Sequence, residues 1–138
     1  YGCPDDVPSV ALNKTSQVGE GAALADEVIL DLQANAGAAE AAGNYAQAKT
    51  LLDQALQVNP ADPQVLQSRA ELAIRDQAWV QAEQYAQRSF DSGAKLGSLC
   101  RRNWLTMHYA RMAQGRSLPP PQLAKNLNEC TLVPPARL

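Results

Sequence analysis

The chain has few of the residues on which catalytic and metal sites depend. Its 138 residues include one histidine, His108, and three cysteines. A Ser-His-Asp or Cys-His arrangement would have to use His108, but Cys100 lies eight positions before it, about 12 Å along a helix axis. No C-x-x-C, H-E-x-x-H, EF-hand or glycine-rich phosphate-loop motif occurs. We therefore expect no enzyme, no cofactor and no metal site, and an enzyme centred on His108 and Cys100 is the alternative.

Aromatic residues and long apolar runs are also scarce. Aromatic residues make up 5% of the chain, and no apolar run approaches the ~20 residues that span a bilayer. No long run alternates apolar and polar residues, which argues against a β-sheet. Hydrophobic residues make up 46% and charged residues 19%, enough apolar surface for a packed core. Length and pattern together predict one all-α domain.

The small net charge of −2 conceals two regions of opposite sign. Residues 1–93 hold 13 acidic and five basic residues, whereas residues 94–138 hold one acidic and seven basic residues. A basic C-terminal third could meet an acidic partner. Equally, the two regions could attract each other or neighbouring molecules. No nucleic-acid-binding motif is present, and the isoelectric point of about 5.3 argues against a nucleic-acid partner.

The first residues read as an arm. Residues 1–19 contain Pro4 and Pro8 and show little periodicity, so we predict a flexible segment. The chain starts without Met or a signal-like apolar region, and we interpret it as processed or trimmed. The tripeptide "YGC" resembles the end of a bacterial lipoprotein signal, which makes Cys3 a candidate lipid anchor and the only expected membrane contact. A free or intermolecular thiol at Cys3 is the rival interpretation.

Residues 43–62, "GNYAQAKTLLDQALQVNPAD", show how the predicted helices are separated. Gly43 can take the left-handed conformation that ends one helix, and Asn44 can cap the next. Pro60 stops that helix, because the residue before a proline avoids the α region. Asp62 and Pro63 are typical of another helix start. The pattern predicts short antiparallel helices.

This punctuation repeats after 34 residues. The matching positions are Tyr45 and Trp79, Ala48 and Ala82, Ala55 and Ser89, and Leu56 and Phe90. A 34-residue period of two helices resembles the tetratricopeptide repeat. The resemblance implies antiparallel helix pairs stacked as a short solenoid over residues 20–130, with units at 29–62 and 63–96. A third helix at 97–115, a capping helix at 120–129 and an extended tail at 131–138 would complete the chain.

Two cysteines fall in the predicted C-terminal helices. Cys100 lies early in the helix 97–115, and Cys130 lies just past the capping helix. An antiparallel pair of helices would bring them together, so we predict a disulfide and an oxidising compartment. The alternative is two buried thiols in a cytoplasmic protein.

In tetratricopeptide folds the first helix of each pair lines a concave groove, and the resemblance therefore implies a partner-binding surface. On this chain it would carry Gln64, Gln67, Glu71, Arg75, Arg101, Arg102, Leu105, His108 and Tyr109. Arginine can hold a carboxylate through two parallel hydrogen bonds, which suits an acidic partner. The alternative is that Arg101 and Arg102 are exposed charges that balance the acidic part of the chain.

These observations favour a non-catalytic module that binds a peptide or protein segment in a concave groove. We expect it to act in an exported, periplasmic or envelope-associated bacterial assembly of the secretion type. A self-associating scaffold element, acting as a homo-oligomer, is the alternative function. A cytoplasmic location is the alternative to export.

Overall fold

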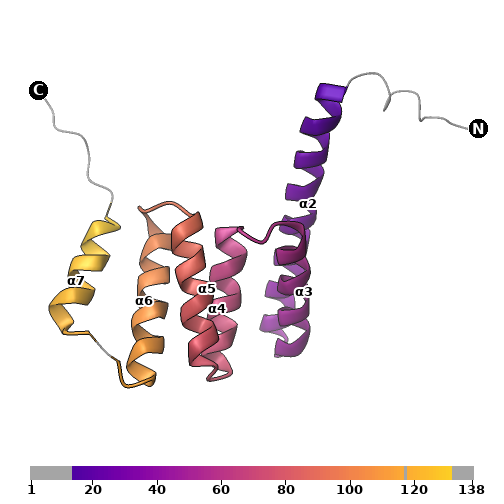
Figure 1. Cartoon of the computed structure of the whole chain (residues 1–138). Helices are drawn as coiled ribbons and strands as arrows, with labels where there is room; N and C mark the ends of the chain where they lie inside the picture. Colours follow the sequence, from indigo (N-terminus) through magenta and orange to yellow (C-terminus); the bar gives the residue numbers. More distant parts are fainter. Residues whose placement is uncertain (1–13, 117, 132–138) are drawn as a thin grey trace, which may run out of the picture.

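The structure, a computed structural model, describes residues 14–116 and 118–131, and within these ranges it contains six α-helices and no strand. The helices stand side by side in a row that runs from α2 to α7 (Figure 1). The predicted all-α class and the stacked helix pairs are confirmed. The helices are α2 (Lys14–Ala41), α3 (Tyr45–Val58), α4 (Pro63–Arg75), α5 (Trp79–Ser92), α6 (Ser98–Ala113) and α7 (Pro120–Glu129).

The first helix is longer than predicted. α2 begins at Lys14, so residues 14–19 belong to the helix rather than to the arm predicted over residues 1–19. The glycines at the predicted boundary weaken a helix by about 1 kcal/mol each but do not end it. Residues 1–13, with Cys3, and residues 132–138 of the predicted tail lie outside the described residues. The division into arm, domain and tail stays a prediction.

The predicted helix boundaries around α3 are confirmed. The Asn44 side chain accepts a hydrogen bond from the Gln47 amide at 3.3 Å and caps α3. The Asp62 side chain accepts one from the Val65 amide at 3.1 Å and caps α4. Gly43 has φ +79°, the left-handed conformation that closes α2. Local residues therefore set where these helices start and stop.

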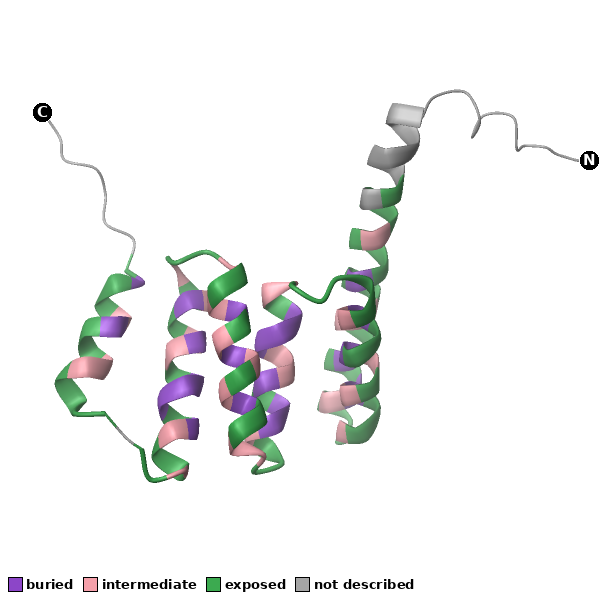
Figure 2. Cartoon of the chain, in the orientation of Figure 1, coloured by how far each residue is buried: buried purple, intermediate pink, exposed green. Residues whose placement is uncertain are grey.

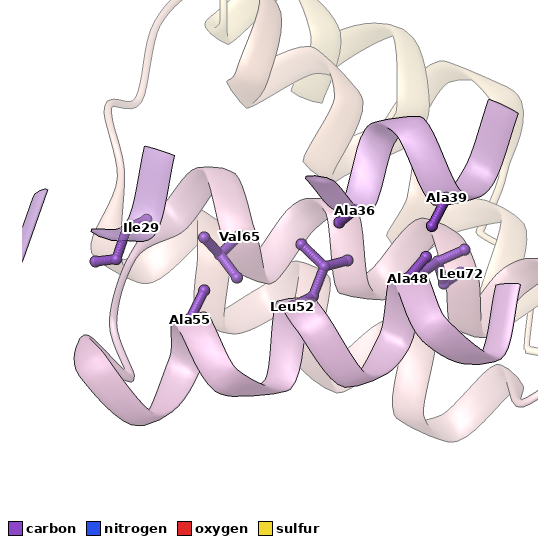
Figure 3. Packing of buried hydrophobic residues seen from close by; sticks show 8 residues of the cluster. All are labelled: Ile29, Ala36, Ala39, Ala48, Leu52, Ala55, Val65 and Leu72. Carbon is purple, nitrogen blue, oxygen red and sulfur yellow. The ribbon is translucent and has the colours of Figure 1, made fainter. Parts of the chain in front are cut away.

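The first core cluster joins the second half of α2 to α3 and α4, and alanine supplies much of it (Figure 3). Small alanine side chains let the helix axes approach closely, while Leu52, Val65 and Leu72 fill the remaining space. The cluster consists of Ile29, Ala36, Ala39, Ala48, Leu52, Ala55, Val65 and Leu72.

The first half of α2 does not share this core. Two large apolar residues in this half are not buried: Leu24 is 60% exposed and Val28 is also exposed. α2 has 28 residues and α3 has 14, so α2 extends well past its neighbour (Figure 2). An apolar face is buried only where another element covers it, and along this half α3 is too short to do so.

Two smaller clusters hold α4, α5 and α6 together. One contains Ala70, Ala86 and Met107 with Tyr85, Phe90 and Trp104 packed around them. The other contains Ala73, Ala82 and Ala110 with Ile74 and Ala78. The Phe90 and Trp104 rings lie 5.0 Å apart in a tilted arrangement. The central helices are therefore packed on several sides.

α7 stands at the end of the row and is bonded covalently to α6 (Figure 1). The predicted disulfide is present: Cys100 and Cys130 are joined, with their Cα atoms 5.6 Å apart, and both residues are 1% exposed. The Gly97 amide donates to the Cys130 carbonyl at 2.8 Å beside the bond. Of the helices described, none is long and apolar enough to cross a membrane.

Candidate functional site

The residues predicted to bind a partner lie on α4 and α6, and the structure divides them by exposure. Most of them reach the surface, but Gln67 and His108 are buried. Arg102 is half-buried. The exposed residues are Gln64, Glu71, Arg75, Arg101, Leu105 and Tyr109.

Gln67 is part of the interface between α4 and α6. Its side chain is 0% exposed. Its Nε2 donates to the Thr106 hydroxyl at 2.7 Å and to a Glu71 carboxylate oxygen at 3.0 Å. A buried and bonded amide of this kind positions two helices and has no surface to offer a partner.

Glu71 and Arg102 bind each other across the same two helices. The guanidinium donates to both carboxylate oxygens, at 2.8 and 3.0 Å. These hydrogen bonds raise the pKa of Arg102 against the opposing effect of burial. On α2, burial and then the negative charge of Glu71 raise the pKa of Glu40. For Arg102, the structure therefore favours the charge-balancing interpretation.

Arg75 also has an intramolecular partner. Its guanidinium carbon lies 3.5 Å from the centre of the Tyr45 ring, a cation–π contact between the end of α4 and the start of α3. Nearby, the Lys49 ammonium donates to Asp76 at 2.6 Å. These contacts join the two helix pairs.

Three of the predicted residues, Leu105, His108 and Tyr109, meet at one place, a cavity between α6 and α7. Its volume is about 330 Å³. The residues on its walls are mostly apolar, and several of them are exposed although they are large. We name it the α6–α7 cavity; it is lined by Leu105, His108, Tyr109, Met112, Leu118, Pro120 and Leu123.

His108 ties this cavity to α7. Its Nε2 lies 3.2 Å from Oδ1 of Asn126, the one fully buried polar side chain of α7. Its ring lies 6.1 Å from that of Trp104. Cys100 is bonded to Cys130, so it carries no thiolate that could act as a nucleophile beside His108. The described part of the chain holds no group of three or more His, Cys, Asp or Glu residues that could bind a metal.

Arg101 lies at the other end of the seam between α6 and α7. It is exposed and sits one helical turn before Leu105, and its guanidinium reaches the Leu127 carbonyl at 3.4 Å. Arg111, by contrast, donates to Glu83 at 2.8 Å, and Arg116 contacts the same carboxylate. Burial alone would raise the pKa of Glu83, but hydrogen bonds from Arg111, Arg116 and Gln114 outweigh it and lower this pKa.

A larger hollow of about 500 Å³ lies along α5, and we do not take it as the site. Among the described residues, its walls come from that one helix, and three of them are glutamines. The ring of Tyr85 on its wall already has the guanidinium groups of Arg69 and Arg88 at 5.0 and 5.7 Å. The α6–α7 cavity is smaller but combines walls from two elements with exposed apolar side chains.

Comparison with known protein families finds a match to one segment of the helical stack. Residues 32–72 match the sequence profile of the tetratricopeptide repeat. The chain contains a tetratricopeptide repeat. The match spans the second half of α2, all of α3 and most of α4. The predicted resemblance is thereby confirmed.

A structural similarity extends beyond the matched segment. The globular C-terminal domain of P. aeruginosa LpoP has a similar structure, with a TM-score of 0.62 and 24% sequence identity. The similarity covers 74% of this chain and 93% of that domain, and at this identity it shows the shared fold. No curated protein matches the chain.

In the order of the helices, the α6–α7 cavity lies after α4 and α5, where α6 and α7 follow. The sequence signalled Leu105, His108 and Tyr109 on α6 but not the rest of the cavity. Met112 continues their spacing at seven residues from Leu105 and could have been included. Leu118, Pro120 and Leu123 reach the cavity only because α7 folds back, which no local pattern records.

Proposed function

We propose that the chain is a non-catalytic protein-interaction module that binds an apolar segment of a partner protein in the α6–α7 cavity. The observation that carries the proposal is a concentration of large exposed apolar side chains at one place. Leu105, Tyr109, Met112 and Leu118 are each more than 40% exposed and line the same cavity. Apolar patches of this kind on a folded surface mark interaction sites, and tetratricopeptide repeats are known as protein-binding modules.

The cavity and Arg101 together define the chemistry of the partner segment. Leu105 and Met112 are about 10 Å apart along α6, and Arg101 is about 6 Å before Leu105. An extended segment advances about 3.3 Å per residue. It would therefore place a carboxylate two residues before an apolar side chain, on the same face of the segment. Such a partner is acidic and apolar.

The buried disulfide supports an exported location. Disulfides persist in oxidising compartments such as the bacterial periplasm and are rare in the cytosol. We infer a periplasmic or envelope-associated module, held in an assembly by the segment that it binds. A lipid anchor at Cys3 stays a prediction.

The test selects peptides from a random 12-residue display library on the immobilised chain and measures their affinities by fluorescence anisotropy. Met112→Glu is expected to weaken binding at least tenfold, because it puts a charge into the apolar cavity. Leu30→Glu on α2 is the matched control, since Leu30 is 63% exposed and Met112 is 57% exposed. Equal loss in both variants, or no selected peptide, would refute binding in the cavity.

The acidic character of the partner has its own pair of variants. Arg101→Glu is expected to lower the affinity for selected peptides about tenfold. Lys125→Glu is the control, because Lys125 follows Leu123 by two residues on α7 and so points away from the cavity. If the selected peptides are apolar but not acidic, and the Arg101→Glu variant binds them normally, binding in the cavity is supported but an acidic partner is refuted.

The alternative function, a self-associating scaffold, makes a different prediction. A scaffold would increase in mass above 14.8 kDa as its concentration rises. Sedimentation equilibrium measures this directly. Self-association that Met112→Glu abolishes would assign the cavity to a second copy of the chain in place of a separate partner.

A further inference from the structure

α7 is held in place by few noncovalent contacts. It packs mainly against α6. Within the helix only Asn126 is buried, while Leu123 and Leu127 are half-buried. A helix of ten residues is marginal on its own in water. Its position must therefore come from its attachments rather than from helix propensity.

These attachments are the disulfide and a few hydrogen-bonded contacts. Besides the covalent bond, they include the His108–Asn126 contact at 3.2 Å and the backbone hydrogen bond from Gly97 to Cys130 at 2.8 Å. The bond joins residues that are 30 positions apart. Closing a loop of this length removes much of the conformational entropy that a released α7 would gain. Without the bond, that entropy favours release.

The α6–α7 cavity exists only while α7 is in place. Leu118, Pro120 and Leu123 form one wall and come from α7 and the connection before it. Without them, the α6 side chains of the opposite wall would be one open helix face. The disulfide therefore lies outside the cavity but determines whether it is formed.

We propose that the Cys100–Cys130 disulfide assembles the α6–α7 cavity, so that the chain gains its binding activity only on oxidation. This inference rests on the proposed function of the cavity. In the reduced chain, α2 to α6 are folded and α7 is released. Binding is then absent in a reducing compartment and present after export, which would keep the module from engaging its partner too early.

The oxidation step has a defined balance. The thiolate of one cysteine attacks a disulfide of an oxidant protein or small molecule and forms a mixed disulfide, and the oxidant loses one thiolate. The second cysteine then attacks the mixed disulfide, which forms the Cys100–Cys130 bond and frees the other oxidant thiolate. Two thiols have become one disulfide, and their two protons end on the two sulfur atoms of the oxidant, which is now reduced to thiols.

Burial makes this step close to permanent. Both cysteine residues are 1% exposed once the bond has formed. A reducing thiolate must reach a sulfur atom, so reduction requires α7 to open first. The bond therefore commits the chain to the binding form and does not cycle with small changes in thiol concentration.

The test compares the oxidised chain with the Cys100→Ala/Cys130→Ala variant. Hydrogen exchange followed by mass spectrometry reports each helix, and anisotropy reports binding of the display-selected peptides. In the variant we expect protection over residues 118–131 to fall at least tenfold, protection of α3, α4 and α5 to persist, and affinity to fall at least tenfold. Unchanged protection of α7, or loss of protection in every helix, would overturn the inference.

A chemical rescue separates the effect of the covalent link from the effect of the two cysteine side chains. In a Cys3→Ser background, the reduced chain is treated either with a reagent that links both sulfur atoms or with iodoacetamide, which caps each one. Linking is expected to restore α7 protection and peptide binding, and capping is not. If α7 stays protected in the variant and peptide affinity is unchanged, the inference fails while the proposed function stands. If α7 is released but peptide affinity is unchanged, the peptides do not bind in the cavity and both proposals fail. If no peptide binds even the oxidised chain, the proposed function fails, and hydrogen exchange still tests whether the bond retains α7.

Discussion

At the scale of the residue, two buried side chains that join helices, Gln67 and His108, lie where a partner cannot reach them. Gln67 bonds Thr106 and Glu71 from a fully buried position, and His108 meets Asn126 in the same way. Glu71 and Arg102 form a two-bonded pair near the surface. Surface pairs of this kind contribute little, about 0–1 kcal/mol, so the buried amide is the more important bond.

We predict that Gln67→Ala lowers the free energy of unfolding by about 2–3 kcal/mol, because it removes buried hydrogen bonds and leaves a hole between α4 and α6. Urea denaturation measures the change. Gln64→Ala, at an exposed position on the same helix, should cost under about 0.5 kcal/mol. Equal effects of the two substitutions would mean that the amide contributes no more than a surface residue.

A second residue-scale prediction concerns acid stability. The pKa of Glu83 is lowered in the folded state, so its contribution is present above its ordinary pKa of 4.5 and is lost as the pH falls through the lower folded value. Glu83→Gln should therefore destabilise the chain at pH 7 and have less effect near pH 3. Urea denaturation at both pH values tests this.

Glu40 is the opposite case, because its pKa is raised in the folded state. Burial and Glu71 raise its pKa, so the ionised form costs stability at neutral pH. Glu40→Gln should raise the free energy of unfolding at pH 7, by under about 1 kcal/mol, and have little effect in acid. Destabilisation by Glu40→Gln at pH 7 would contradict the assigned cause.

At the scale of the element, two glycines of the first helix pair have opposite roles. Gly37 lies inside α2, and Gly43 closes it at φ +79°. A Cβ atom added at either position meets nothing within 4 Å, so only backbone conformation matters. Gly37→Ala should stabilise by about 0.5–1 kcal/mol, and Gly43→Ala should destabilise by about 1–2 kcal/mol. Thermal denaturation gives both values, and a shift of the same sign in both variants would refute this assignment.

Element boundaries could be predicted where a local residue sets them. Gly43, Asn44 and Asp62 act on their own helix ends, and the structure agrees with them. The start of α2 was missed because a single glycine does not stop a helix. The exposure of Leu24 cannot be predicted from α2 alone, because it depends on the length of a different helix.

For the site, too, features set by local spacing could be predicted, and features set by packing between helices could not. Spacing along α6 placed Leu105 and Tyr109 on one accessible face. It could not show that Gln67 turns into a neighbouring helix, or that Arg102 is occupied by Glu71. Those outcomes depend on how two helices cross, and one sequence without its three-dimensional packing does not determine the crossing.

At the scale of the whole molecule, stability should be unequal along the row of helices. α4 contacts α3, α5 and α6, whereas the first half of α2 extends past its neighbour. In stacked repeats, stability is carried by the interfaces between neighbours. We therefore predict that amide hydrogen exchange is slowest in α4 and fastest in residues 14–28. Comparable protection of the two segments would show that α2 is stabilised by something other than packing.

The acidic and the basic part of the chain form ion pairs with each other. Glu71 and Glu83 come from the acidic part of the chain, and they bind Arg102 and Arg111 from the basic part. These pairs connect α4 and α5 to α6. Several charges of the acidic and basic parts of the sequence therefore pair between stacked helices. Arg101 remains exposed where α6 meets α7.

The length of α2 has a mechanical consequence. A helix of 28 residues is about 42 Å long, and roughly half of that length projects past α3. Force applied at Lys14 would reach the body of the molecule through a stiff lever. In an assembly that holds the chain at its N-terminal side, α2 would keep the α6–α7 cavity at a distance set by the length of the helix.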